Sequence, residues 1–400
     1  MPARIFSLRF SFFYAFLMIG SGLSLPFFPL WLHAKGLTVG QIAEIVAGMT
    51  ACRVLAVPLA AMIADKYRNR RTVIIACGIA TFFAYMLLAT ASSFGAIFLC
   101  SLVVSLCFAP VFPLAEGFSV DGSVAHKLDY GRMRLWASIS FLAGSVGGGA
   151  LLQFLPIGTL IYLIVVAQGL SGLAAFFLPI DPDRETLKQE AVSASGLSSL
   201  YRLLISGSFG VFLIAVSLAQ GSHGMLYSFG PVRWDALGFD KFTIGSFWAI
   251  SIMAEVTLFG FSNHLVRRIG AINLMVIGIA VGVVRWALMA YDPPLGVNVL
   301  TQLLHAITFA MLHLGTMHYI RQTVPPGLRN SAQGLYAAFS GGIVMTAAIG
   351  ISGIFYSSLL GKTYLIMAAM SLVALSFALA LKRTSPKALA AADTSDFRQT

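Results

Sequence analysis

Four ionisable side chains lie deep inside long apolar stretches of the sequence: Arg53, Glu255, Arg285 and His305. A charge at bilayer depth costs from about 3 kcal/mol to well above that, and it is tolerated where it faces a cavity or a partner. A guanidinium can bind a carboxylate through two parallel hydrogen bonds. A buried carboxylate can load and release a proton as its surroundings change. Ionisable residues held at such depth are therefore candidates for a functional site.

The alternative for each of these residues is an internal salt bridge or hydrogen bond that fixes helix packing. Three charges in one helical bundle are expensive to keep for packing alone. We therefore favour the functional interpretation for Arg53, Glu255 and Arg285, with Glu255 as the expected proton carrier.

Histidines are harder to assign, because one imidazole can be satisfied by a neighbouring hydroxyl or carbonyl. The two interpretations of His305 are nearly balanced. Its neighbours favour function slightly, since Thr301, His305 and Thr308 follow the i, i+4, i+7 spacing of one helical face. His223 and His313 are interpreted as packing residues.

The amino-acid composition indicates that these residues belong to a membrane protein. Of the 400 residues, 58% are hydrophobic and 10% are charged, a balance typical of an integral membrane protein. The net charge of +11 falls in short clusters between apolar stretches, so we expect no nucleic-acid partner. The four cysteines have no CxxC spacing, and no metal site is expected. Walker A, HExxH and GxSxG motifs are also absent from the sequence, so we expect no cofactor, no ATP-driven transport and no enzyme.

Windows of roughly 20 mainly apolar residues predict an all-α protein with twelve transmembrane helices. The polar stretch at 181–196 separates six of them from the other six. We expect a first bundle at 1–180, a cytoplasmic central loop at 181–202, a second bundle at 203–383 and a disordered cytoplasmic tail at 384–400. The expected spans are 8–32, 41–64, 72–91, 95–118, 131–155, 158–179, 203–230, 242–265, 271–291, 296–320, 329–357 and 362–382.

Charge asymmetry predicts the orientation. With both termini in the cytoplasm, 20 of the 26 Lys and Arg residues fall on the cytoplasmic side. Four fall on the other side: Lys35, Arg233, Lys241 and Lys362. We expect a monomeric multi-pass protein of a bacterial inner membrane.

A faint internal repeat has a spacing of 200 residues. GIA at 78–80 recurs at 278–280, and LWASIS at 135–140 aligns with LYAAFS at 335–340. Two matches at one offset are consistent with duplicated halves, as in transporters that move two bundles about a central site.

The stretch LDYGRMRLW at 128–136 contains two arginines that face opposite ways, because residues two apart on a helix point about 200° from each other. Arg132 is expected to anchor the helix end at the cytoplasmic surface. Arg134 shares an i, i+4, i+7 stripe with Ser138 and Phe141, and it is matched by spacing to Glu116.

Several stretches together resemble the major facilitator superfamily, within the branch that contains lactose permease and the phenylpropionate permeases. They are LPFFPLWLH at 25–33, ADKYRNRR at 64–71, DYGRMR at 129–134, AEVTLFGFSNHLVRR at 254–268 and GVVRW at 282–286. The resemblance covers nearly the whole chain.

At three positions the sequence differs from the pattern of lactose permease. Phe141 stands where that protein has a sugar-stacking tryptophan, and Thr308 stands where it has a carboxylate. Arg53 adds a cation where it has a small polar residue. These differences favour an aromatic carboxylate over a sugar as the substrate.

The resulting hypothesis is a proton symporter that imports a small organic solute by alternating access. Rival functions are a sugar or nucleoside symporter, a drug efflux antiporter of the same superfamily, and a non-transporting membrane sensor or scaffold. The partners are the solute, protons and the lipid bilayer. The expected roles are substrate binding for Arg53, Glu116, Arg134 and Phe141, proton coupling for Glu255, Arg285 and His305, and a conformational latch for Asp65, Arg70 and Arg71.

Overall fold

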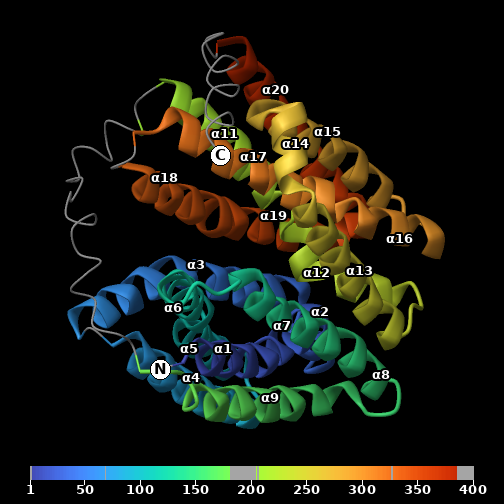
Figure 1. Ribbon diagram of the computed structural model, residues 1–400. Helices are drawn as coiled ribbons and strands as arrows, with labels where there is room; N and C mark the ends of the chain where they lie inside the picture. Colours follow the sequence, from blue (N-terminus) through green and yellow to red (C-terminus); the bar gives the residue numbers. More distant parts are fainter. Residues whose placement is uncertain (1, 68, 181–203, 205–206, 326–327, 385–400) are drawn as a thin grey trace. The chain divides into compact units, whose positions relative to one another are not determined.

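A computed structural model describes residues 2–67, 69–180, 204, 207–325 and 328–384. The predicted central loop at 181–202 and nearly all of the predicted tail at 384–400 lie outside these residues. The described chain is helical throughout (Figure 1), and it divides into two compact units. Unit 1 comprises Met1–Lys188 and Leu226–Ala249, and unit 2 comprises Gln189–Met225 and Ile250–Thr400. The bundle boundaries expected from the sequence, 1–180 and 203–383, stay a prediction.

The first part of the chain forms six spans. Their elements are α1 (Ala3–Leu17) with α2 (Ile19–Ala34), α3 (Val39–Lys66), α4 (Arg70–Thr90), α5 (Phe94–Phe108) with α6 (Val111–Ala125), α7 (Tyr130–Leu142) with η1 (Ala143–Gly147) and α8 (Gly148–Leu151), and η2 (Ile157–Thr159) with α9 (Leu160–Ala175).

Six more spans follow. Their elements are α11 (Gly207–Gly221) with α12 (Gly224–Ala236), α13 (Lys241–Gly260) with α14 (Ser262–Ile269), α15 (Ala271–Met289), α16 (Leu295–Leu303) with η4 (Ala306–Met311) and α17 (Leu312–Thr323), α18 (Arg329–Tyr336) with η6 (Ala337–Val344) and α19 (Met345–Leu359), and η7 (Leu360–Thr363) with α20 (Tyr364–Thr384).

This arrangement confirms the expected twelve spans. By length and composition alone, ten segments of the described chain can cross a membrane. One of them, Ser331–Arg383, has 53 residues, which is about 80 Å of helix and more than twice the bilayer core. It therefore contains two spans, which meet at η7. The twelfth span, α7–α8, is less apolar than the others, since it carries Arg134 together with several glycines and serines.

Side chains next to the helix starts account for several of the boundaries. Thr38 and Gln41 form a reciprocal capping box at the start of α3, and Asn69 caps α4. Asp129 caps α7 by accepting from the backbone N–H of Arg132. At α13, Asp240 accepts from the backbone N–H of Thr243 at 2.7 Å, and this hydrogen bond holds the pKa of the Asp240 carboxyl below its ordinary value.

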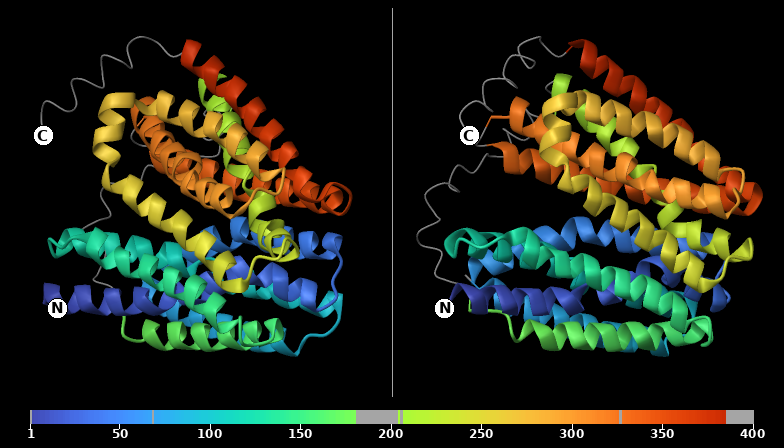
Figure 2. Two further views of the ribbon diagram at one scale, coloured as in Figure 1. Left: turned by 90° about the vertical axis from the view of Figure 1, so that its right-hand side faces the viewer. Right: turned by 45° about the vertical axis from the view of Figure 1, so that its right-hand side comes forward.

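Each unit has its own apolar core, and equivalent helices pack together in both. In unit 1, α4 packs against α9, and α1 packs against α7 and α9. In unit 2, α15 packs against α20, and α11 packs against α20 and η6 (Figures 1 and 2). The repeat at a spacing of 200 residues relates α4 to α15 and α7 to α18 with η6, so the same pattern of neighbours is found where the repeat predicts it.

Three spans contain a π-helical segment: η1, η4 and η6. A π segment inside an α-helix contains an extra residue and is frequent at functional sites. The segment η4 begins directly after His305 and contains Thr308.

Gly144 in η1 offers a test of the packing in unit 1. A Cβ there would overlap the backbone carbonyl oxygen of Ile19, and it would lie 3.1 Å from the Cα of Gly22. Since a backbone cannot move aside as a side chain can, we expect Gly144→Ala to lower the free energy of unfolding by about 1–3 kcal/mol. Thermal unfolding in detergent measures the effect. Gly147→Ala is the matched control, because nothing lies within 4 Å of its Cβ; equal stability of the two variants would contradict the prediction.

Candidate functional site

The first candidate residue, Arg53, lies at the middle of the 28-residue helix α3. Ala60 and Ala64, seven and eleven residues later, share its face and are buried. Leu55 and Met62 lie on the opposite face and are 65% and 66% exposed, as expected for side chains that contact lipid. Arg53 itself is exposed, but because it shares the face of these two buried alanines, its charge points away from the face of α3 that contacts lipid.

Glu116 of α6 and Arg134 of α7 form an ion pair in unit 1. Arg134 Nε lies 3.2 Å from Glu116 Oε1, and the Tyr130 hydroxyl donates to the same oxygen at 2.7 Å. The guanidinium also lies 4.7 Å from the ring centre of Phe112. Both charged side chains are partly exposed, so a solute can reach them.

The sequence analysis did not identify Tyr130 as part of this site. It also did not identify the hydrogen-bonded group formed by Tyr14, Ser119 and Ser140 beside the ion pair. The Tyr14 hydroxyl is 2.8 Å from Ser119 Oγ, which in turn donates to the Glu116 carbonyl at 3.0 Å. Ser140 Oγ donates to the Tyr14 carbonyl at 2.9 Å. Tyr130 could have been found, since it lies one helical turn before Arg134. Tyr14 gave no signal, because only the fold brings the first span beside α6 and α7.

The neighbouring residue Arg132 has a side chain that is 88% exposed and that forms an ion pair with Asp129 at 3.4 Å. Its expected role as a cytoplasmic anchor stays a prediction. The expected role of Phe141 in substrate binding stays a prediction. Phe141 is 5% exposed, and its backbone carbonyl faces Gly22 of α2. In this structure Phe141 is therefore a packing residue at a contact between helices, and stacking on a solute would require movement.

Of the three residues expected to form a latch, Asp65, Arg70 and Arg71, the two arginines contact α6 and the end of the sixth span. Arg70 is buried, forms an ion pair with Asp121 of α6 at 2.6 Å, and lies over the Phe118 ring. Arg71 Nη2 donates to the Phe176 carbonyl at 2.8 Å. The sequence did not identify Asp121, because no spacing relates it to α4.

Glu255, Arg285 and His305 come together in unit 2 from three different spans. His305 Nε2 lies 2.9 Å from Glu255 Oε1, and Arg285 Nη1 lies 2.9 Å from His305 Nδ1. Arg285 has no exposed surface, and the other two are at most 9% exposed. The structure thus joins all three residues that were selected for coupling.

Hydroxyl and amide groups extend this cluster. Arg285 Nη1 donates to Thr308 Oγ1 at 2.9 Å, and Nη2 donates to Gln302 Oε1 at 3.4 Å. Ser251 Oγ donates to the same Gln302 oxygen at 3.2 Å. The guanidinium also lies 4.5 Å from the ring centre of Trp286. These contacts fix the orientation of Arg285 from several sides.

His223 belongs to the cluster as well, although the sequence favoured a packing role for it. Its Nε2 lies 3.4 Å from Thr308 Oγ1, and its ring centre is 5.3 Å from that of His305. The break between α11 and α12 that presents it is flanked by Gly221 and Gly224, a signal that the sequence prediction did not use. His313, interpreted in the same way, packs with its ring 6.1 Å from that of Tyr336.

The partners fix the protons on the central histidine. Because a guanidinium only donates, His305 Nδ1 must accept from Arg285, so the proton of the neutral ring is on Nε2 and points to Glu255. A charged imidazolium would place a second N–H against Arg285. The arrangement therefore fits an ionised Glu255, a neutral His305 and a charged Arg285, which together carry no net charge.

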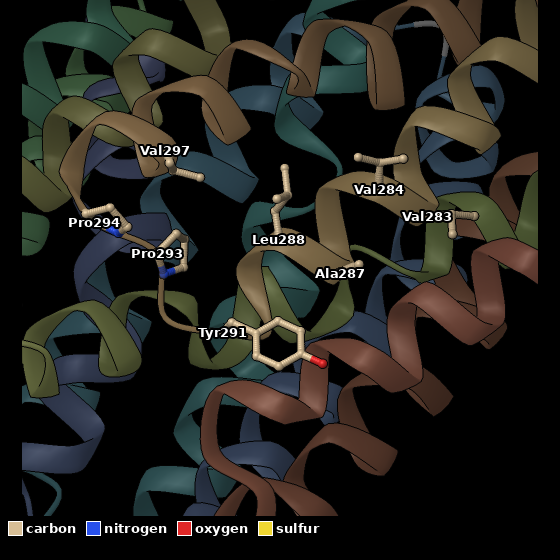
Figure 3. Close-up of a pocket in the computed structure, with 8 residues that line it drawn as sticks. All are labelled: Val283, Val284, Ala287, Leu288, Tyr291, Pro293, Pro294 and Val297. Carbon is tan, nitrogen blue, oxygen red and sulfur yellow. The ribbon is translucent and has the colours of Figure 1, made fainter.

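An apolar groove of about 590 Å³ lies on the other side of α15 (Figure 3). Val284 and Leu288 line it together with Pro293, Pro294 and Tyr291, and its lining residues carry no charge. Val284 and Tyr291 are 56% and 70% exposed, whereas Arg285 faces the interior. The groove is therefore a surface for lipid tails rather than a site for a charged solute.

Comparison with known proteins adds independent information. A model of the MFS_1 like family matches residues 6–378. The "Probable 3-phenylpropionic acid transporter" of Escherichia coli strain K12 is 28% identical over 92% of this chain and 94% of that protein. The "Nucleoside permease NupG" of the same organism is 23% identical over 76% of each chain. A crystal structure of the nucleoside transporter NupG aligns with a TM-score of 0.82 at 20% identity, over 95% of this chain and all of that chain, and shows the shared fold.

Proposed function

Because this chain belongs to the MFS_1 like family of membrane transporters, we propose that it is a proton symporter that imports a small aromatic carboxylate. Transport would proceed by alternating access across the bacterial inner membrane. A carboxylate of the phenylpropionate type is the preferred substrate.

The observation that carries this proposal is the charge on the inner face of α3. Among the described residues, no carboxylate is found within ion-pairing distance of Arg53, whereas Arg134 and Arg285 each have an acidic or polar partner. A cation at the middle of a span is costly, and an anionic solute would lower this cost. The planar guanidinium offers such a solute two parallel hydrogen bonds.

The cluster in unit 2 supplies a physical basis for coupling. When Glu255 takes up a proton, Arg285 loses the counter-charge that this carboxylate supplies. The resulting positive field raises the affinity of the protein for an anion, and a bound anion in turn favours protonation of Glu255. Proton and solute would therefore bind together, as symport requires.

Three further observations support the proposal. The relative from Escherichia coli that is named as a 3-phenylpropionic acid transporter aligns over nearly the full chain. The excess of Lys and Arg on one side favours cytoplasmic termini. The ion pairs of the proposed site are formed within one chain, so a monomer holds every residue that the proposal uses.

Purified protein in liposomes with an external pH probe tests the function. We expect 3-phenylpropionate to alkalinise the medium on addition, and maltose and a nucleoside to leave its pH unchanged. Protein-free liposomes correct for acid that crosses the bilayer unaided. Arg53→Gln should raise the KM for the acid by about 10-fold or more, the cost of a lost hydrogen bond to a charged group, and Arg132→Gln should not.

Other outcomes are equally informative. A response to the nucleoside or to maltose alone would replace the aromatic acid by that class of substrate. Acidification of the medium on drug addition would indicate efflux. If labelled acid equilibrates without any proton movement, the claim of symport fails.

A further inference from the structure

The seventh span is interrupted where it meets the coupling cluster. The helix α11 ends at Gly221 and α12 begins at Gly224, and the two residues between them, Ser222 and His223, are each 1% exposed. Ser222 Oγ accepts from Trp286 Nε1 at 2.9 Å. The break thus directs two successive polar side chains to the residues around Arg285.

The hydrogen bonds of His223 give it a defined tautomer. Its Nδ1 lies 3.1 Å from the backbone carbonyl of Gln220, and a carbonyl can only accept, so Nδ1 carries the proton. In the neutral ring Nε2 is then an acceptor. The Thr308 hydroxyl lies 3.4 Å from it and 3.4 Å from the backbone carbonyl of His305, so this hydroxyl has two acceptors within reach.

The same donor-to-acceptor order extends from the Thr308 hydroxyl to the guanidinium of Arg285. If the Thr308 proton points to His223, the lone pairs of the same hydroxyl face Arg285 Nη1, which donates to it at 2.9 Å. The other proton of Nη1 goes to His305. These hydrogen bonds form a continuous series from the Gln220 carbonyl through His223, Thr308, Arg285 and His305 to the Glu255 carboxylate.

We infer that His223 is a positioning residue, whose Nε2 lone pair orients the Thr308 hydroxyl and so holds Arg285 for proton-linked binding of the substrate. This inference deepens the proposed function and rests on it. The charged and titratable groups that face His223 are Arg285 and His305. A proton on Nε2 would place a second positive charge against Arg285. His223 therefore acts as a neutral acceptor, and Glu255 takes up the proton.

Two substitutions separate the ring nitrogens. His223→Gln retains an acceptor at the position of Nε2 but cannot titrate, and His223→Asn retains a donor near Nδ1 without that acceptor. We expect His223→Asn and Thr308→Val each to raise the KM for the transported acid by about 10-fold. His223→Gln and Thr308→Ser should stay within about 3-fold of the native protein, with an unshifted pH profile. His313→Gln, outside the cluster, is the control.

A double-mutant cycle makes the inference testable without any substrate. Thermal unfolding in detergent of His223→Asn, Thr308→Val and their combination should show that the second change adds little to the first. Strictly additive effects with a normal KM for His223→Asn would overturn the inference. So would a His223→Gln variant that exchanges solute but no longer accumulates it, because His223 would then carry the proton. A coupled cycle in a protein that transports no acid would instead contradict the proposed function.

Discussion

Replacing Glu255 by glutamine is expected to abolish accumulation of the substrate while exchange of solute across the membrane continues. An electroneutral symporter that moves one proton with each monovalent acid accumulates it about 10-fold per unit of pH difference, since one pH unit is worth about 1.4 kcal/mol. Glutamine retains an acceptor for His305 but cannot take up a proton, so the accumulation ratio should fall to about one.

Labelled acid in liposomes with an imposed pH difference of one unit measures this ratio. Protein-free liposomes give the contribution of passive diffusion. Glu44→Gln is the matched control, because Glu44 is an exposed carboxylate near the start of α3. Normal accumulation by the Glu255→Gln protein would show that another group carries the proton.

The second large effect concerns the charge balance of the same cluster. Replacing Arg285 by leucine leaves the buried Glu255 carboxylate without the opposite charge that stabilises it, and removing one partner of a buried ionic group costs about 3–5 kcal/mol. We expect a corresponding loss of thermal stability in detergent. Combining Arg285→Leu with Glu255→Gln should recover part of this loss, since the buried charge is removed.

The comparison needs an arginine outside the cluster. Arg132→Leu serves, because its side chain is 88% exposed and its local ion pair contributes little. The contrary outcome is a double variant that loses the stability lost by Arg285→Leu plus all of the stability lost by Glu255→Gln alone. The charges of the two residues would then not stabilise each other.

The sequence predicted those features that depend on whether a side chain prefers lipid or water. The twelve spans follow from apolar length, and the depth of Glu255, Arg285 and His305 follows from their place within those lengths. The Glu116–Arg134 pair was predicted from its spacing and a family resemblance, and the structure brings the two side chains together.

The sequence could not predict contacts that depend on how helices rotate against one another. Tyr14 reaches Ser119, and Arg70 reaches Asp121, only because the first and third spans pack beside α6. His223 enters the cluster through a helix break whose flanking glycines, Gly221 and Gly224, do not reveal which residues the break faces. Phe141 was placed on the correct helical stripe, yet its helix is packed so closely against α2 that the ring is buried.

The π segment η4 determines the rotational phase of the tenth span. Each residue of an α-helix advances its direction by about 100°, so the extra residue of a π turn offsets everything before it by roughly that angle. Gln302 and His305 precede η4, whereas Leu312 and Gly315, which pack against α15, follow it. Conversion of η4 into a regular α turn would swing Gln302 and His305 away from Arg285 without moving α17. A change in this one turn would therefore be enough to dismantle the coupling cluster while the packing of α17 against α15 stays in place.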